Sequence, residues 1–225
     1  MTLKPLSHDG QSLAGLSRLA GSPPGQCAAN LRDAFYGSLP WEPLEQPLAG
    51  AALPPDAASA RWWTLLQRLA DERSLQHFLT QLADLQDAAA QQARGAGDYP
   101  LLAVRTVRFS LEADLATAQA ATTVARAMLR EVAPATLANL PKLPRLPADQ
   151  SADHTAAGSS GWQRLKAQHV ETAAVAVAAQ AAAVDAMRGQ WQQTGRPIDE
   201  VLDALTASRQ AQLTWLAAVT RYQRA

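Results

Sequence analysis

Apolar positions recur every three or four residues along most of the chain after residue 56. The most regular run is carried by Val104, Val107, Leu111, Leu115, Ala118, Thr122, Ala125, Leu129 and Val132. A spacing of about 3.5 residues is typical of a helix packed along its length against another helix. No segment alternates apolar and polar residues as a half-buried strand does. The pattern therefore predicts an all-α protein.

A second regular run lies in the last third of the chain. It is carried by four residues placed seven positions apart, Val170, Val177, Val184 and Trp191. The run stops at Gly195-Arg196-Pro197, and another apolar stripe begins directly afterwards. A short break between two long helical patterns predicts that the two helices fold back on each other as an antiparallel hairpin.

The glycine-rich break at 95–100 repeats this design. Gly97 precedes Gly195 by 98 positions, and the residues around the two glycines align at the same offset without a gap. Self-similarity at a fixed offset indicates a duplicated helix–break–helix unit. We therefore expect two long antiparallel helical hairpins, at 56–133 and 162–225, in a coiled-coil-like four-helix arrangement.

The remaining segments are rich in residues that interrupt helices. Residues 1–55 contain many prolines with glycines between them and show no helical period, which predicts an irregular arm draped outside the hairpins. Residues 134–161 contain four prolines followed by a stretch rich in Ser, Gly and Asp. This composition predicts a linker that extends over the surface between the two hairpins.

Composition and charge narrow the class of protein. The chain has 225 residues, of which 48% are apolar, and its 20 basic and 20 acidic side chains balance. This balance argues against nucleic acid or an anionic membrane as the main partner. The sequence contains no run of about 18 apolar residues, so it predicts no transmembrane segment. Charged residues interrupt the first thirty positions, so we expect either an intracellular protein or an export signal that this sequence does not represent.

Residue types that carry catalysis or bind metals are scattered. The four histidines lie in different segments, and the single cysteine, Cys27, excludes an internal disulfide. Asp199 and Glu200 fall in the first turn of an expected helix, where carboxylates complement the helix dipole. No glycine-rich loop follows a strand as a phosphate-binding loop would. We therefore expect no catalytic, cofactor-binding or metal-binding residues, and a protein that is not an enzyme.

The last helical pattern carries an aromatic row. Trp215 and Tyr222 lie seven positions apart, on a face shared with Val201 and Ser208 and offset from the leucine stripe. An exposed aromatic row of this kind is a natural contact surface for another helix. We therefore expect an oligomer face at Trp215 and Tyr222. The alternative is that helices of the first hairpin cover this row within the monomer.

Three segments resemble a known family. The run from Gly195 to Leu205, followed by Gln210-Ala211-Gln212-Leu213 and by Tyr222, resembles the C-terminal tip and returning helix of TolC-family outer-membrane efflux proteins. The segment 94–129 is similar to the tip and helix of that family's first repeat, and Trp62-Trp63-Thr64-Leu65-Leu66 resembles the entry helix of its lipoprotein branch. The chain is shorter than family members and lacks the β-barrel strands before each tip. It looks like a shortened relative without the barrel.

This resemblance implies a function in transport. A TolC-like relative would be an efflux or secretion component of the cell envelope, in the periplasm or at the outer membrane, and would act through its coiled-coil hairpins as a homo-oligomer, with a trimer favoured. In the family, the hairpin tips meet a periplasmic adaptor protein. The matching positions here are Gly97, Asp98, Gly195, Arg196, Pro197 and Asp199.

Two alternatives remain open at the level of the sequence. The tip residues could form hairpin turns and nothing more. The whole chain could instead be a soluble helical scaffold or protein-interaction module unrelated to transport, located in the cytoplasm if the absent export signal is real.

Overall fold

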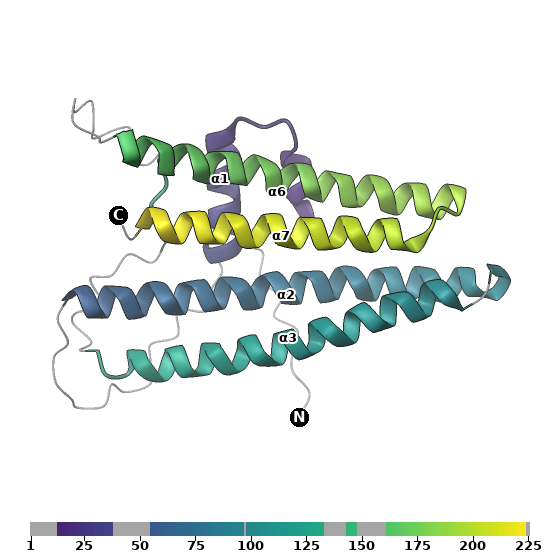
Figure 1. The fold of residues 1–225 in the computed structure, drawn as a ribbon, viewed down its shortest axis with the longest axis horizontal. Helices are drawn as coiled ribbons and strands as arrows, with labels where there is room; N and C mark the ends of the chain where they lie inside the picture. The colour runs from purple at the N-terminus through teal and green to yellow at the C-terminus, as the bar shows by residue number, and fades with distance from the viewer. Residues whose placement is uncertain (1–12, 38–54, 97, 133–142, 148–160, 224–225) are drawn as a thin grey trace.

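The computed structural model describes residues 13–37, 55–96, 98–132, 143–147 and 161–223. Within these ranges every regular element is helical and no strand is present. Four long helices dominate (Figure 1). They are α2 (Pro55–Ala96), α3 (Tyr99–Leu129), α6 (Gly161–Thr194) and α7 (Ile198–Gln223). The predicted all-α fold class is therefore confirmed.

The long helices form the two predicted antiparallel hairpins. α2 pairs with α3, and α6 pairs with α7. Figure 1 shows the four helices side by side in the order α6, α7, α2, α3, with both hairpin tips at the same end of the molecule. α7 contacts α2 and also reaches α3, so the two hairpins are joined mainly through α7 and α2.

The predicted heptad seam of α6 lies in the core. Its four residues are at most 4% exposed: Val170, Val177, Val184 and Trp191. On α3, Val104 and Leu129 are fully buried. Alanines such as Ala174 and Ala178 lie between the larger side chains and are also buried, so neighbouring helices approach closely. Burial of these seams removes a continuous apolar strip from water, which is the main term that stabilises long paired helices.

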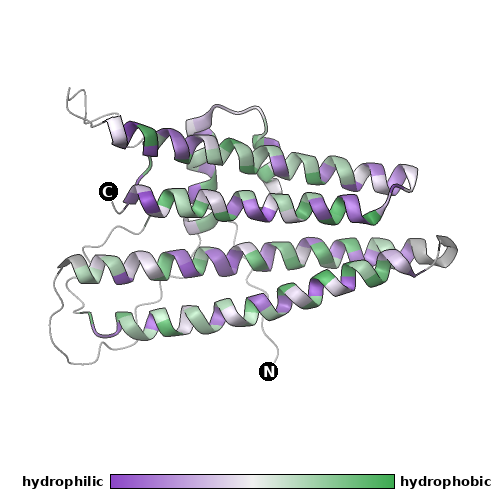
Figure 2. Cartoon of the chain, in the orientation of Figure 1, coloured by the Kyte–Doolittle hydropathy of each residue, from purple (hydrophilic) through white to green (hydrophobic). Residues whose placement is uncertain are grey.

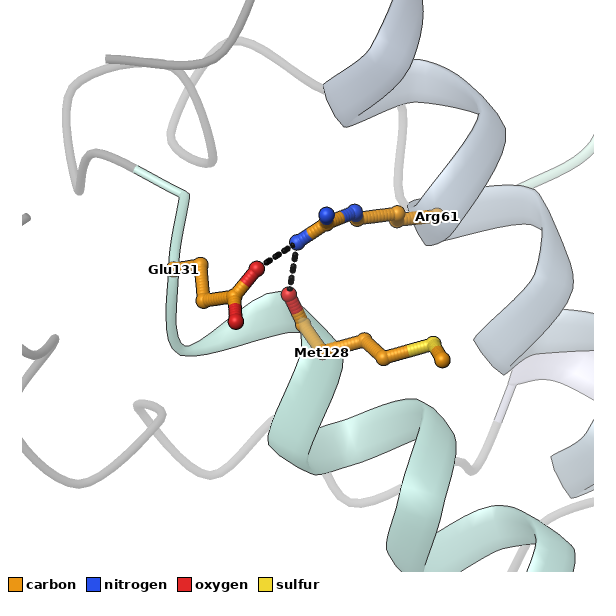
Figure 3. A network of polar contacts seen from close by, with 3 residues as sticks. All are labelled: Arg61, Met128 and Glu131. Atoms are coloured by element: carbon orange, nitrogen blue, oxygen red, sulfur yellow. Dashed lines mark hydrogen bonds and ion pairs between the residues drawn. The ribbon is translucent and has the colours of Figure 1, made fainter. Parts of the chain in front are cut away.

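The base of the first hairpin is closed by an arginine. Arg61, near the start of α2, donates a hydrogen bond of 2.7 Å from Nη1 to the carbonyl oxygen of Met128 and forms an ion pair with Glu131 (Figure 3). Carbonyl groups in the last turn of a helix have no intrahelical donor, so a guanidinium from a neighbouring helix is a favourable partner. This contact holds the end of α3 against the start of α2.

The N-terminal region requires a correction. The sequence predicted an irregular arm over 1–55, but its described part is helical. It contains a 3₁₀ helix η1 (Leu13–Leu19), an α-helix α1 (Pro24–Arg32) and a π-helical turn η2 (Asp33–Gly37). Leu31 and Phe35 are completely buried, and these elements pack on α6 and α2.

The correction has a local and a tertiary cause. Pro24 occupies the first turn of α1, where a missing N–H costs nothing, so this proline starts a helix and does not break one. The helices are too short to show a period, and packing on α6 and α2 stabilises them. Residues 1–12 and 38–54 of the predicted arm lie outside the described residues.

Part of the predicted linker is also fixed to the hairpins. In 143–147, Leu146 is 2% exposed, and the Arg145 backbone N–H donates to Gln223 Oε1 at 3.3 Å. Gln223 Nε2 donates in return to the Arg145 carbonyl. This short stretch is therefore packed against the end of α7. The rest of the linker lies outside the described residues, apart from its last residue, Gly161, which begins α6.

One helix has the length and composition of a possible membrane span. Among the described helices, α6 alone is long and apolar enough to cross a membrane by length and composition, with a mean hydropathy of 1.3 over 18 residues. Isolated polar residues interrupt its alanines and valines, so the helix contains no unbroken apolar run of that length. α6 packs against α7, α1 and η1, and a core helix of a protein can have the same composition.

Candidate functional site

The two hairpin tips are joined directly. The Tyr99 hydroxyl, at the start of α3, donates to the Asp199 carboxylate at the start of α7, with distances of 3.0 Å to Oδ2 and 3.2 Å to Oδ1. Asp199 raises the pKa of Tyr99 by accepting this hydrogen bond and through its negative charge. The contact brings together the first turns of two helices that are 100 residues apart in sequence.

The second tip is a tight turn. Gly195 has a φ of +67°, which side chains other than glycine rarely adopt, and its N–H donates to the Trp191 carbonyl at 3.1 Å. Pro197 follows just before α7, where its carbonyl accepts the Glu200 N–H at 3.2 Å. Arg196 pairs with the Glu200 carboxylate at 3.0 Å. The turn thus presents an exposed guanidinium beside an exposed carboxylate.

The first tip is described only in part. Asp98 is exposed, and its carbonyl accepts the first helical hydrogen bond of α3, from the Leu102 N–H at 3.0 Å. The Asp98 side chain makes no capping hydrogen bond to the helix, so its carboxylate is free to face outward. Gly97 lies outside the described residues.

A rigid apolar base lies beneath the polar tips. Trp191 and Ile198 flank the second turn and are each 2% exposed. Because buried side chains hold both ends of this turn, the exposed charges of Arg196 and Asp199 occupy defined positions. The structure thus brings together five of the six predicted tip residues at one end of the molecule. Polar groups on a rigid support can bind a protein partner with little loss of conformational entropy.

The predicted oligomer face requires a correction. Trp215 is 0% exposed, and its ring packs against Phe35 and Tyr36 of η2 with centroid distances of 5.5 Å and 6.3 Å. Val201 and Ser208, on the same face of α7, are also buried. Tyr222 is half-buried beside this cluster. The row is covered within the monomer: η2 packs on Trp215, and Val201 lies in a buried cluster with Phe78 and Leu82 of α2. The alternative expectation, cover by the first hairpin, therefore holds for part of the row.

Sequence reasoning missed a buried polar contact between the hairpins. Ser74 on α2 donates to Gln212 Oε1 on α7 at 2.8 Å, and both residues are about 1% exposed. Nearby, burial raises the pKa of Asp71 to about 6, although the charges of Arg68 and Arg209 act in the opposite direction. The only signal in the sequence was that polar residues interrupt apolar faces at these positions, which does not reveal their partners.

The described residues contain few groups arranged for catalysis or metal binding. Within those ranges, no group of three or more His, Cys, Asp or Glu side chains is arranged to hold a metal ion. His77 is largely buried beside Phe78, and burial lowers its pKa to about 4, so its imidazole is neutral at physiological pH. The tips therefore remain the strongest candidate site, and their chemistry suits binding.

Comparisons of the chain with protein-family models, with curated proteins and with solved structures found no match in any of the three. The relationship to TolC-family proteins thus stays a prediction from the sequence.

Proposed function

We propose that this protein is a non-catalytic helical component that binds another protein through its paired hairpin tips. The observation that supports this proposal is the hydrogen bond between Tyr99 and Asp199, which holds the two tips at one end. The resemblance of the tips to TolC-family proteins suggests the setting: an efflux or secretion assembly of the cell envelope, with a periplasmic adaptor protein as the partner. Any trimer would have to form through surfaces other than the buried Trp215 face.

A second candidate function is a helical scaffold unrelated to transport, located in the cytoplasm. The burial of Trp215 against Phe35 and Tyr36 favours it, because the face expected to build a channel-like oligomer is part of the monomer core. In this case the tips could still bind a partner, but that partner would not belong to the envelope.

Site-specific photo-crosslinking in cells tests the proposal. A photoreactive amino acid at Arg196, at the tips, should give a discrete adduct with a second protein. The same amino acid at Leu165, an exposed residue near the start of α6 and at the opposite end of the molecule, is the matched control and should not give that adduct. Identical adduct patterns from both positions, or none from the tip, would contradict tip binding.

Cell fractionation then separates the two settings. An envelope-associated protein whose tip adduct contains another envelope protein supports the TolC-like function. A cytosolic pool that gives a tip adduct with a cytosolic protein supports the scaffold and rules out the transport setting.

A further inference from the structure

α3 is apolar on two sides. Val104, Leu111 and Leu129 face the core, as the heptad seam predicts. At about 100° per residue, a different set of apolar side chains falls on the side away from this seam. We call this set the outer stripe; its members are Leu102, Phe109, Ala113, Ala116, Ala120, Val124 and Met128. All seven are exposed, and the four large ones are between 50% and 69% exposed.

The elements that the structure describes leave this stripe open. α3 is the outermost helix of the layer, next to α2 and in slight contact with α7 (Figure 1). Hydrophobic residues recur along its whole length (Figure 2). A helix with one solvent-facing side normally carries polar residues there, so a second apolar side indicates that something else covers it.

A groove runs beside the stripe. It has a volume of about 310 Å³ and lies where α3 and α7 flank α2. Phe78 and Leu82 of α2, Leu205 of α7 and Val107 of α3 are among its apolar lining residues, and Thr106 lies on its α3 side, next to the outer stripe. The groove adjoins the outer stripe at Thr106, so a helix that lies along the stripe could insert apolar side chains into the groove beside it.

The charges next to the stripe are mainly positive. The two acidic residues of α3 are already paired: Glu112 with Arg108 at 2.9 Å, and Asp114 with Arg209 of α7 at 3.1 Å. Arg105, Arg126 and Arg130 are exposed and fall on one flank of the stripe. An occupant of the stripe would therefore meet a basic border.

We propose that the outer stripe and its groove bind an amphipathic helix of another protein, with acidic residues on the flank that meets these arginines. Small alanines occupy the middle of the stripe, and they allow a second helix backbone to approach closely. From Leu102 to Met128 the stripe is about 39 Å long at 1.5 Å per residue, which matches a partner helix of about 26 residues. The proposal concerns a surface separate from the tips and does not rest on their function.

The same features argue against two other occupants. In an antiparallel pair of α3 helices, Leu102 would meet Met128 of the second copy, and the same alignment would bring Arg105 close to Arg126, so the like charges would repel. A lipid surface would gain little from the alanine centre of the stripe, because alanine buries little area on insertion. A separate helix with acidic residues could approach closely at the alanine centre and pair its carboxylates with the arginines on the flank.

Two designed helical peptides provide the probe. Each has about 26 residues and the same leucine seam; one carries glutamates and the other lysines on the flank. Fluorescence anisotropy with the full-length protein should show the glutamate peptide binding at least about tenfold more tightly at low salt, with the difference shrinking as salt is added. Phe109→Ser should weaken binding, whereas Leu165→Ser, an exposed leucine of α6, should leave binding unchanged.

Exchanging the charges gives a second and independent readout. The double variant Arg105→Glu and Arg126→Glu changes only exposed side chains, so it should fold normally and should prefer the lysine peptide. A reversed preference supports the proposal, because a structural defect would weaken both peptides equally.

The following results would overturn the proposal: equal affinity for the two peptides, no binding of either peptide at about 100 µM, or equal losses from Phe109→Ser and Leu165→Ser. Sedimentation that shows a dimer abolished by Phe109→Ser would assign the stripe to a second copy. Binding to phosphatidylglycerol-containing vesicles that is lost in the same variant would assign it to a membrane. Either finding would mean that the stripe binds a second copy or a membrane in place of a partner helix.

Discussion

Replacing Trp215 with alanine perturbs the point where the N-terminal segment meets the second hairpin. The indole is completely buried between α7 and η2, in contact with Phe35 and Tyr36. The substitution leaves a large cavity next to two aromatic rings, which the surrounding helices can fill only in part. We expect a large loss of stability without loss of the helical fold.

The structure sets the size of this loss. Truncating a buried tryptophan to alanine typically costs about 3–5 kcal/mol, through lost transfer free energy and the cavity that remains. Within the described residues the Trp215 Nε1 has no hydrogen-bond acceptor, so removing it breaks no polar contact. The cost should therefore lie at the lower end, about 3 kcal/mol, which lowers Tm by roughly 6–12 °C for a chain of this size.

Urea unfolding followed by far-UV circular dichroism measures this loss. Trp162→Ala is the matched control, because Trp162 is 66% exposed and the same truncation there should change the free energy of unfolding little. If both variants unfold at the same urea concentration, Trp215 is not buried in solution. A Trp215→Ala variant that keeps its stability but loses self-association would show that Trp215 lies on an oligomer face, and would refute the packing described above.

Three further predictions concern the core. Burial raises the pKa of the Asp71 carboxyl to about 6 from 3.8, so this group gives stability at low pH that is lost as pH rises through 6. Asp71→Asn should therefore raise the free energy of unfolding more at pH 7.5 than at pH 4, by up to about 3 kcal/mol, and a pH-independent difference in urea midpoints would contradict this. Burial lowers the pKa of His77 to about 4 from 6.5, so the neutral imidazole gives stability above pH 6.5 that is lost as pH falls towards 4. His77→Leu should therefore reduce the loss of stability at acid pH in the same titration, and an unchanged loss of stability between pH 6.5 and pH 4 would contradict this. Val177→Asp places an unpaired carboxylate at a fully buried position and should lower the free energy of unfolding by several kcal/mol. Ala176→Asp, at an exposed position next to it, should melt near the wild-type temperature, and equal melting temperatures for the two variants would show that the seam is wrongly assigned.

The hairpins could be predicted from sequence because their signals are local. The seam from Val170 to Trp191 recurs at four positions over three heptads, and each break combines glycine with proline, so neighbouring residues alone define helix, turn and return. Such patterns report which residues share a face of a helix. They do not report what covers that face.

The missed features depend on contacts between residues that are distant in sequence. Trp215 was expected to be exposed because the residues that cover it, Phe35 and Tyr36, lie in short helices with no visible period. The pairing of Tyr99 with Asp199 joins positions 100 residues apart, and no local pattern specifies it. The tip positions were therefore predictable, but their pairing was not.

The most direct test of the account is the distance between the two tips in solution. Spin labels on cysteines introduced at Asp98 and Arg196, with the buried Cys27 replaced by alanine, can be measured by double electron–electron resonance. Helix spacing predicts a narrow distribution at roughly 15–25 Å, once the label linkers are included, and Tyr99→Phe should broaden it. A label pair at Arg130 and Arg196, at opposite ends, should be separated by more than about 40 Å. A long distance between Asp98 and Arg196 would mean that the hairpins do not present their tips together, and the proposed binding end would not exist.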